Sequence, residues 1–419
     1  MIGMSHDTRA RGRRYFPMTK TSNTRLMIAA ITALFLYGAI ASMLGTLLPD
    51  LSAQFHMTAK QNGSIASMQA LGLVLASIVA GPLIDSRGKK TGFLGGMALI
   101  VISLFALPNS VGWKTIMAAM FVLGVGGGTI VTAANTLVSD IGEDRRASML
   151  SFANVFFGLG GLLTPFIAAN LLHGNAIGLS YLIAVLATVT FILHVTTPMP
   201  PPAIHQGFVF SQALRLPDKS LLFLLSLFNF LYVSCEVAFW NWLTKYLVGE
   251  GISRPVALNI LALGFASGML AGRLISSRLL LKYSAVSVSF VCSGLMVITT
   301  YWTLHAGNPA IAGLSVFCAG AVMGPVFPSI IAVAGDAFSQ MTATCVGIVI
   351  TAGWIGVVTS SWLIGLLAGS DGTHLRMALL LLPVFSAVMI LINLGLRPLL
   401  ARARARSRIV YDAPAQHVS

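Results

Sequence analysis

Charged side chains are scarce in this chain. They make up 9% of its 419 residues, whereas hydrophobic residues make up 56%. Soluble domains carry roughly 25% charged residues, so a chain of this composition cannot bury its apolar surface in a water-soluble core. The composition excludes a soluble globular protein and predicts one that resides in a lipid bilayer.

Acidic residues are rarer than basic ones, with 12 Asp and Glu against 26 Lys and Arg and a formal net charge of +14. In a soluble protein this charge would suggest nucleic-acid binding. In a membrane protein, basic residues instead mark the loops that face the cytoplasm and contact anionic lipid. We therefore expect membrane lipid, and no nucleic acid, among the partners.

Cysteine is also rare, and all four cysteines lie inside apolar runs: Cys235, Cys292, Cys318 and Cys345. This placement argues against a disulfide framework and favours small packing residues. The sequence has no histidine or cysteine spacing typical of a metal site, no nucleophile elbow and no nucleotide-binding loop. We expect no metal, no cofactor and no enzyme activity.

Long apolar runs are abundant, and twelve of them approach the ~20 residues that a helix needs to cross a ~30 Å bilayer core. They lie near residues 26–48, 63–84, 91–108, 115–138, 148–172, 176–197, 221–247, 256–279, 285–306, 310–334, 342–368 and 375–396. The sequence therefore predicts an all-α integral membrane protein with twelve transmembrane helices.

One long internal connection, residues 198–220, divides the chain. It opens with four prolines in residues 198–202, which cannot continue a membrane helix. We expect two six-helix bundles, residues 26–197 and 221–396, with basic tails at residues 1–25 and 397–419. The sequence at residues 81–87 partly repeats at residues 272–278, at the same point of each half, which predicts pseudo-symmetry.

The distribution of Lys and Arg predicts the orientation. If both termini are cytoplasmic, five of the 26 basic residues lie in outer loops: Lys60, Lys114, Lys245, Arg254 and Arg376. This bias agrees with the positive-inside rule. We expect a monomeric multi-pass protein of a bacterial inner membrane with both termini in the cytoplasm.

The charged stretch between the second and third apolar runs carries a family resemblance. Residues 81–90 read Gly-Pro-Leu-Ile-Asp-Ser-Arg-Gly-Lys-Lys. The spacing Gly-x-Leu-x-Asp-x-x-Gly-Lys-Lys resembles the loop between helices two and three of transporters in the Major Facilitator Superfamily. We expect the opening Gly81 to let backbones pass closely.

Other motifs resemble the fucose permease branch of that superfamily, which carries sugars with protons. They are Ala133–Asn135, Phe156–Gly160, Gly272–Arg273 and the segment from Gly324 to Asp336. The resemblance covers nearly the whole chain. It implies a secondary transporter that works by alternating access and imports a sugar or a similar small polar solute with protons.

The chain departs from the branch at its acids. The branch pattern has acids in spans one and four, whereas here the first span contains no carboxylate and Val131 precedes the Thr132–Asn135 motif. This difference argues against proton coupling by the usual route of the branch.

The resemblance also implies a cytoplasmic gate that holds the two halves together. Asp85 would face the start of span eleven, where unpaired backbone donors favour an anion, and Arg87 would pair with Asp140. The remaining members of the predicted gate are Gly81, Gly88, Lys89, Arg146 and Arg273. The alternative is that these basic residues only fix the topology and contact lipid phosphate.

Glu236 is the acid that lies well inside a predicted span. Placing an acid at this depth in a membrane costs free energy, so a functional role is the default hypothesis. A carboxyl group removed from water also takes up a proton more readily. On a helix, Asn229, Tyr232, Glu236 and Trp240 share one face. We predict that this face binds the solute and that Glu236 couples transport to protons. The alternative is a neutral, hydrogen-bonded Glu236 within the bundle.

Further solute contacts are predicted at four polar or aromatic positions of other spans: Tyr37, Asn135, Asn154 and Trp354. Buried amides also tie membrane helices together without binding solute, and this alternative stays open. Two other functions stay open as well: proton-coupled efflux of an amphiphilic compound, and a transporter-like sensor that binds a solute without moving it.

Overall fold

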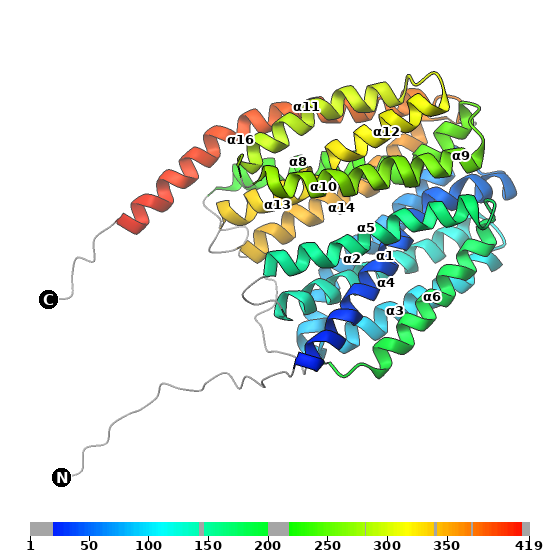
Figure 1. The fold of residues 1–419 in the computed structure, drawn as a ribbon, viewed down its shortest axis with the longest axis horizontal. Helices are drawn as coiled ribbons and strands as arrows, with labels where there is room; N and C mark the ends of the chain where they lie inside the picture. The colour runs from blue at the N-terminus through cyan, green and yellow to red at the C-terminus, as the bar shows by residue number, and fades with distance from the viewer. Residues whose placement is uncertain are drawn as a thin grey trace, which may run out of the picture.

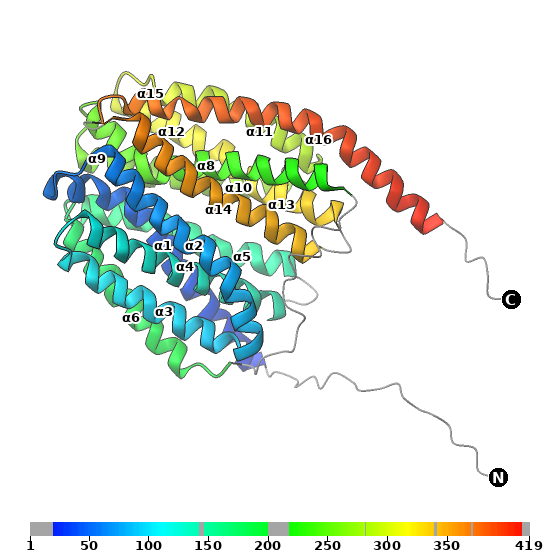
Figure 2. The same cartoon turned by 180° about the vertical axis from the view of Figure 1, so that it is seen from behind.

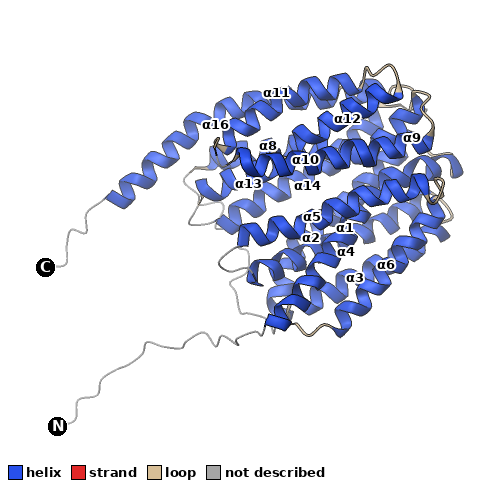
Figure 3. Ribbon diagram, viewed as in Figure 1, coloured by secondary structure: helices blue, strands red, loops and turns tan. Residues whose placement is uncertain are grey.

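The computed structural model describes residues 20–141, 146–199, 218–280, 282–338, 342–369 and 372–412. These residues form helices joined by short loops, without strands in the described part (Figure 3). Twelve helical segments are long and apolar enough to cross a membrane. The predicted all-α membrane architecture is confirmed.

Two layers of helices make up the molecule (Figure 1). The N-terminal half contains α1 (Lys20–Gln54), α2 (Ala59–Arg87), α3 (Lys89–Ala106), η1 (Leu107–Asn109), α4 (Trp113–Ile141), α5 (Arg146–Asn170) and α6 (Ala176–Thr196). The C-terminal half contains α8 (Lys219–Gly249), α9 (Arg254–Asn259), η2 (Ile260–Ala266), α10 (Ser267–Leu279), α11 (Ala285–Thr303), α12 (Pro309–Met323), α13 (Val326–Ala337), α14 (Thr342–Leu367), α15 (Leu375–Leu379) and α16 (Leu381–Asp412). The start of α1 and the end of α16 lie at the same end of the molecule, here called the terminal end, and the opposite end is the far end (Figure 2).

Polar caps at the far end set several helix boundaries. Thr58 and Gln61 form a reciprocal capping box at the start of α2, with hydrogen bonds of 3.2 and 2.8 Å. Asn175 and Asn308 cap α6 and α12 by accepting backbone hydrogen bonds. At the terminal end, Gly88 separates α2 from α3 with a φ of 89°, a conformation that glycine adopts without strain.

Three predicted spans differ in detail from a plain α-helix. Span eight contains a π-helical stretch, η2, between α9 and α10. Span ten is interrupted between Met323 and Val326, and the Tyr232 hydroxyl donates a 2.9 Å hydrogen bond to the Met323 carbonyl beside this break. The last helix, α16, runs through Pro398 to Asp412, beyond the predicted end at residue 396 (Figure 1).

Glycines bring helix backbones of the N-terminal half into direct contact. A Cβ atom added to Gly124 of α4 would lie 2.0 Å from the Gln69 carbonyl oxygen of α2, and one added to Gly72 of α2 would lie 2.3 Å from the Phe121 carbonyl oxygen of α4. Small residues at such crossings favour close packing of membrane helices. Gly81 does not act in this way here, because no described atom lies within 4 Å of a Cβ there. The close approach expected at Gly81 as part of the gate stays a prediction.

We predict that Gly124→Ala lowers the stability of the protein by about 1–3 kcal/mol, since the new methyl group overlaps a backbone that cannot move independently. Thermal unfolding of the purified protein in detergent would show the loss as a lower Tm. The matched control is Gly95→Ala on the exposed side of α3, where the new methyl group meets no atom within 4 Å. Equal Tm values for the two variants would contradict this account of the α2–α4 contact.

Candidate functional site

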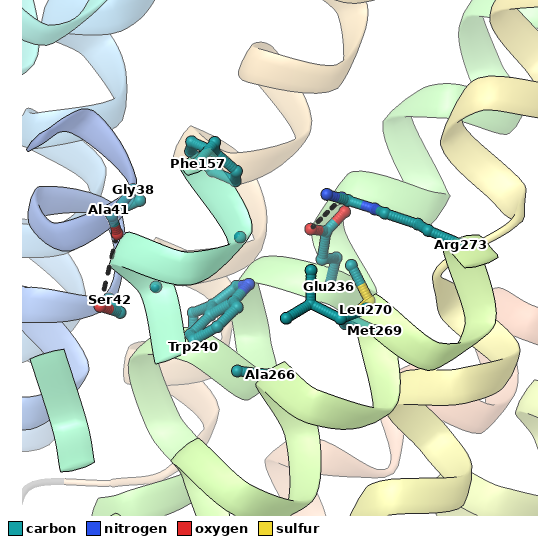
Figure 4. A pocket seen from close by; sticks show the side chains of 12 residues that line it. Gly38, Ala41, Ser42, Phe157, Glu236, Trp240, Ala266, Met269, Leu270 and Arg273 are labelled. Atoms are coloured by element: carbon teal, nitrogen blue, oxygen red, sulfur yellow. Dashed lines mark hydrogen bonds and ion pairs between the residues drawn. The ribbon is translucent and has the colours of Figure 1, made fainter. Parts of the chain in front are cut away.

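A cavity lies between the two halves, near the middle of the long helix α8 (Figure 4). About 330 Å³ of space there is not filled by protein atoms, a value that includes open solvent at the mouth. The N-terminal half contributes residues of α1 and α5, and the C-terminal half contributes residues of α8, η2 and α10. The twelve lining residues are Gly38, Ala41, Ser42, Phe157, Gly158, Gly161, Glu236, Trp240, Ala266, Met269, Leu270 and Arg273.

An acid and a base face each other in this cavity. Glu236 Oε1 lies 4.0 Å from Arg273 Nη2, and the two side chains are 14% and 28% exposed. Figure 4 shows the guanidinium of Arg273 reaching across from α10 toward the carboxylate on α8. Arg273 therefore lies in the cavity wall and not at the cytoplasmic gate, where the resemblance placed it. An ionised carboxylate in the bundle interior needs a nearby positive charge, and the long arginine side chain reaches far enough to supply it.

Aromatic rings form part of the apolar wall and pack behind it. Trp240 packs edge-to-face on Phe265, with ring centroids 5.0 Å apart, and Phe265 stacks on Phe239 at 4.8 Å. Phe265 belongs to the π-helical stretch η2, which ends at the cavity residue Ala266. Sequence periodicity does not reveal a π-helix, although such stretches are frequent at functional sites.

Tyr37 lies behind the cavity wall. It is buried on α1, and its ring centroid is 5.6 Å from that of Phe157, a lining residue. The predicted solute contact of Tyr37 is therefore replaced in this structure by a packing contact that supports Phe157.

Asn229 and Tyr232 do not line the cavity, contrary to the prediction. Both are fully buried, and Asn229 Nδ2 donates a 2.8 Å hydrogen bond to the Val349 carbonyl of α14. Tyr232 bonds to the Met323 carbonyl at the end of α12. The two residues share a helix face with Glu236 and Trp240, but they lie nearer the terminal end, where this face packs against α12 and α14. Asn229 and Tyr232 miss the cavity because they lie at a different height along α8, although they are on the same face of the helix as Glu236 and Trp240.

The other predicted contacts are dispersed. Asn135 on α4 and Asn154 on α5 are half-buried but do not line the cavity. Trp354 on α14 is also half-buried and packs against core residues of both halves. Of the eight predicted binding residues, the structure brings Glu236 and Trp240 together in the cavity.

At the terminal end, Lys89 forms the ion pair with Asp140 that was predicted for Arg87. Lys89 Nζ lies 2.5 Å from Asp140 Oδ2, whereas Arg87 is exposed. The turn at Gly88 makes Lys89 the first residue of α3, which packs along α4, so its side chain reaches the end of α4. Lys90 donates a 2.9 Å hydrogen bond to the Val195 carbonyl of α6. These contacts join helices within the N-terminal half.

The side chains of Asp85 and Arg146 lie outside the part of the chain that is described. The contact of Asp85 with the start of span eleven, and a gate formed by these residues, therefore stay predictions.

The far end carries a set of contacts between the halves that the sequence did not reveal. Asp50 at the end of α1 forms an ion pair with Arg254 at the start of α9, and Arg254 Nη2 also donates to the Thr46 carbonyl at 3.2 Å. Asn170 of α5 and Asn259 of α9 exchange amide hydrogen bonds of 2.8 and 3.3 Å. We call Asp50, Arg254, Asn170 and Asn259 the far-end latch. One feature of the sequence could have pointed to these contacts: Arg254 is among the few basic residues of the outer loops.

Backbone contacts reinforce the latch. A Cβ atom added to Gly63 of α2 would lie 2.5 Å from the Ser361 carbonyl oxygen of α14, and one added to Gly45 of α1 would overlap the Trp240 carbonyl of α8. Ser67 Oγ donates a 2.8 Å hydrogen bond to the Val358 carbonyl. The two halves are therefore interlocked at the far end.

Comparison with known proteins identifies the family to which this arrangement of helices belongs. The sequence profile of the Major Facilitator Superfamily matches residues 30–361. The chain belongs to the Major Facilitator Superfamily. It is thus a multi-pass membrane protein of a superfamily of secondary transporters, as the sequence motifs predicted.

Relatives within the superfamily are distant in sequence. The protein TsgA of Escherichia coli O157:H7 is 24% identical over 350 residues, which cover 81% of this chain and 87% of TsgA. The transporter FucP, solved in an outward conformation, is 20% identical with a TM-score of 0.62 over 89% of this chain and 98% of its own. A bacterial homologue of the human lysosomal transporter Spinster, solved inward-facing and unoccupied, is 13% identical with a TM-score of 0.74 over 92% of this chain and 99% of its own. The structural matches show a shared fold.

We predict that Arg254→Ala weakens the closed far end and exposes the cavity to that side. The ion pair is partly buried, so its loss should shift the balance between closed and open far ends by about 0.5–1 kcal/mol, or about two- to fivefold. The measurement is the rate at which a membrane-impermeant maleimide, added on the far side, labels Ala41→Cys in a variant without the four native cysteines.

Arg376→Ala is the matched control, because Arg376 pairs with Glu250 at the same end but within one half. It should leave the labelling rate unchanged. A rate in Arg254→Ala no higher than in the control would show that the ion pair does not hold the far end closed.

Proposed function

We propose that this transporter imports a sugar or a similar small polar solute together with protons, by exposing the central cavity alternately to the two sides of the membrane. The proposal rests mainly on the position of Glu236. Within the described part of the chain it is the carboxylate placed at mid-height of a span and lining the cavity between the halves. A side chain at this point can exchange a proton with either side only as the halves rock.

We also propose the orientation expected from the basic loops, with both termini in the cytoplasm of a bacterium and the far end outside its inner membrane. In this orientation the interlocked far end closes the outer side, so the structure corresponds to an inward-facing state. The TM-scores support this assignment: the likeness to the inward-facing Spinster homologue is greater than that to outward-facing FucP, although FucP is closer in sequence.

The proposed cycle couples the cavity to the latch. Protonation of Glu236 neutralises one partner of its ion pair and leaves Arg273 without a counterion, while solute fills the space between the halves. Return to the outward state requires the ion pair between Asp50 and Arg254 to separate. Because two interconverting states of this kind differ in free energy by only about a few kcal/mol, small changes in the cavity are enough to shift their populations.

The structural likeness to a variant of the Escherichia coli fucose:proton symporter FucP, with 19% identity and a TM-score of 0.63, supports the choice of a sugar-like solute and of protons. We propose further that the protein acts as a monomer in contact with lipid and has no enzyme activity.

We predict that Glu236→Gln abolishes proton-driven accumulation but preserves exchange. Glutamine fills the same space and imitates the protonated carboxyl, yet it cannot release a proton. Proteoliposomes with an imposed pH gradient should therefore accumulate labelled solute with the wild type, whereas the variant should only bring the solute to equal concentrations on the two sides. Counterflow, which needs no net proton movement, should continue and lose its dependence on pH.

Glu250→Gln is the control, since Glu250 pairs with Arg376 at the far end and does not line the cavity. It should accumulate solute normally. Proton-driven accumulation that survives in Glu236→Gln would remove this residue from the coupling mechanism.

A further inference from the structure

Arg273 is the one cation among the twelve residues of the central cavity, and Glu236 is the one acid. The resemblance that suggests a sugar assigned no role in the cavity to this arginine. The remaining lining residues are apolar or small, apart from Ser42. A neutral sugar with many hydroxyl groups would find few partners here other than the two charged side chains.

The geometry of the pair leaves the guanidinium available. The 4.0 Å separation between Glu236 Oε1 and Arg273 Nη2 is too long for a hydrogen bond, so the contact is an ion pair in which the arginine N–H groups are not engaged by the carboxylate. Arginine presents several donors in a planar fork that matches a carboxylate in bidentate fashion. Arg273 is also 28% exposed at its side chain, so a solute in the cavity can reach it.

The charge balance of the cavity depends on Glu236. When Glu236 is ionised, the pair is neutral, and an additional anion would leave the cavity with an uncompensated negative charge. When Glu236 is protonated, the positive charge of Arg273 is left without a counterion in a poorly solvated site, which is costly. Among the described residues, the other titratable groups near Glu236 are Tyr37 on α1 and Tyr232 and Cys235 on α8, and none of them ordinarily carries a negative charge at neutral pH. The missing charge has to come from the solute.

We propose that the transported solute is a small organic monoanion whose carboxylate binds Arg273 after a proton has neutralised Glu236. The proposal deepens the function proposed above and depends on it. The proton is taken up from the open side onto a Glu236 oxygen, the solute carboxylate replaces Glu236 as the counterion of Arg273, and both leave together on the other side. Proton and anion are thereby carried in equal numbers, with no net movement of charge.

The walls of the cavity define the rest of the solute. Phe157 and Trp240 offer apolar faces to a carbon skeleton, and a single cation suits one carboxylate and not two. Glycines keep the cavity open: a Cβ atom at Gly158 would lie 2.6 Å from Leu270, and one at Gly161 would lie 3.3 Å from the Trp240 ring. A compact monocarboxylate with an apolar ring face, such as a sugar acid or an aromatic acid, fits this description.

The first experiment compares probes that share a ring, differ in charge and do not cross a bilayer unaided: glucuronate with glucose, and galacturonate with galactose. Proteoliposomes receive either an inward pH gradient at zero membrane potential or an inside-negative potential without a pH gradient. A monoanion carried with one proton should accumulate with the pH gradient and show no response to the potential. A neutral solute carried with one proton would respond to both.

The outcomes separate the two proposals. Accumulation of a neutral probe that responds to the potential overturns the anion proposal and leaves proton-coupled import in place. Equilibration of probes without accumulation under either gradient overturns proton coupling, and the anion proposal with it. Failure of both carboxylate probes to bind or to be transported overturns the anion proposal.

The second experiment counts protons during binding by calorimetry in buffers of different ionisation enthalpy. The wild type should take up one proton for each carboxylate bound near neutral pH, whereas Glu236→Gln should bind without proton uptake and independently of pH. Arg273→Gln should weaken carboxylate binding by about 30-fold or more, because it removes the buried counterion. Arg273→Lys should restore part of the affinity. Arg278→Gln, an exposed position at the end of α10, is the control and should bind like the wild type.

If Arg273→Gln does not fold because Glu236 is left unpaired, the double variant Glu236→Gln/Arg273→Gln removes both charges. It should fold and bind no carboxylate. Carboxylate binding of wild-type strength in the double variant, or binding to the wild type without proton uptake, would overturn the proposal.

Discussion

A carboxylate in the middle of a membrane-spanning helix is stable only if the surrounding bundle compensates its charge, and this constraint governs the centre of the molecule. Glu236 on α8 is compensated by Arg273 on α10, so both helices are held in one half with their charged groups directed at the other half. Removing the charge of either partner would leave the other without a counterion.

Trp240 connects this cavity with the far end. Its ring forms part of the cavity wall and lies against Gly161, while its backbone carbonyl lies against Gly45 of α1. In the proposed cycle, a solute that displaced the ring would act on the same residue whose backbone forms one of the closest contacts between the halves. Packed contacts of this kind have discrete arrangements and do not deform continuously, so a small displacement in the cavity favours a different packing at the far end.

The sequence was sufficient for the architecture and for the position of the central acid. Hydropathy and the charged loop at residues 81–90 predicted twelve spans and the superfamily, and a lone carboxylate inside a span marked Glu236. The sequence was not sufficient to predict which side chains contact one another. The face shared by Asn229, Tyr232, Glu236 and Trp240 was correct as helix geometry, but which part of a face meets a cavity depends on neighbouring helices. For the same reason Lys89, and not Arg87, pairs with Asp140, and the pairing of Asp50 with Arg254 brings together residues distant in sequence.

The described ion pairs differ in what the rocking of the halves does to them. Lys89–Asp140 lies within the N-terminal half, and Glu236–Arg273 and Arg376–Glu250 lie within the C-terminal half, so they persist when the halves move as rigid bodies. Asp50–Arg254 joins the halves and has to break. Asp50 also accepts a 3.1 Å hydrogen bond from the Ala176 backbone N–H at the start of α6, which orients its carboxylate toward Arg254. Charge at the far end thus joins the two halves, whereas we propose that charge in the cavity selects what is carried.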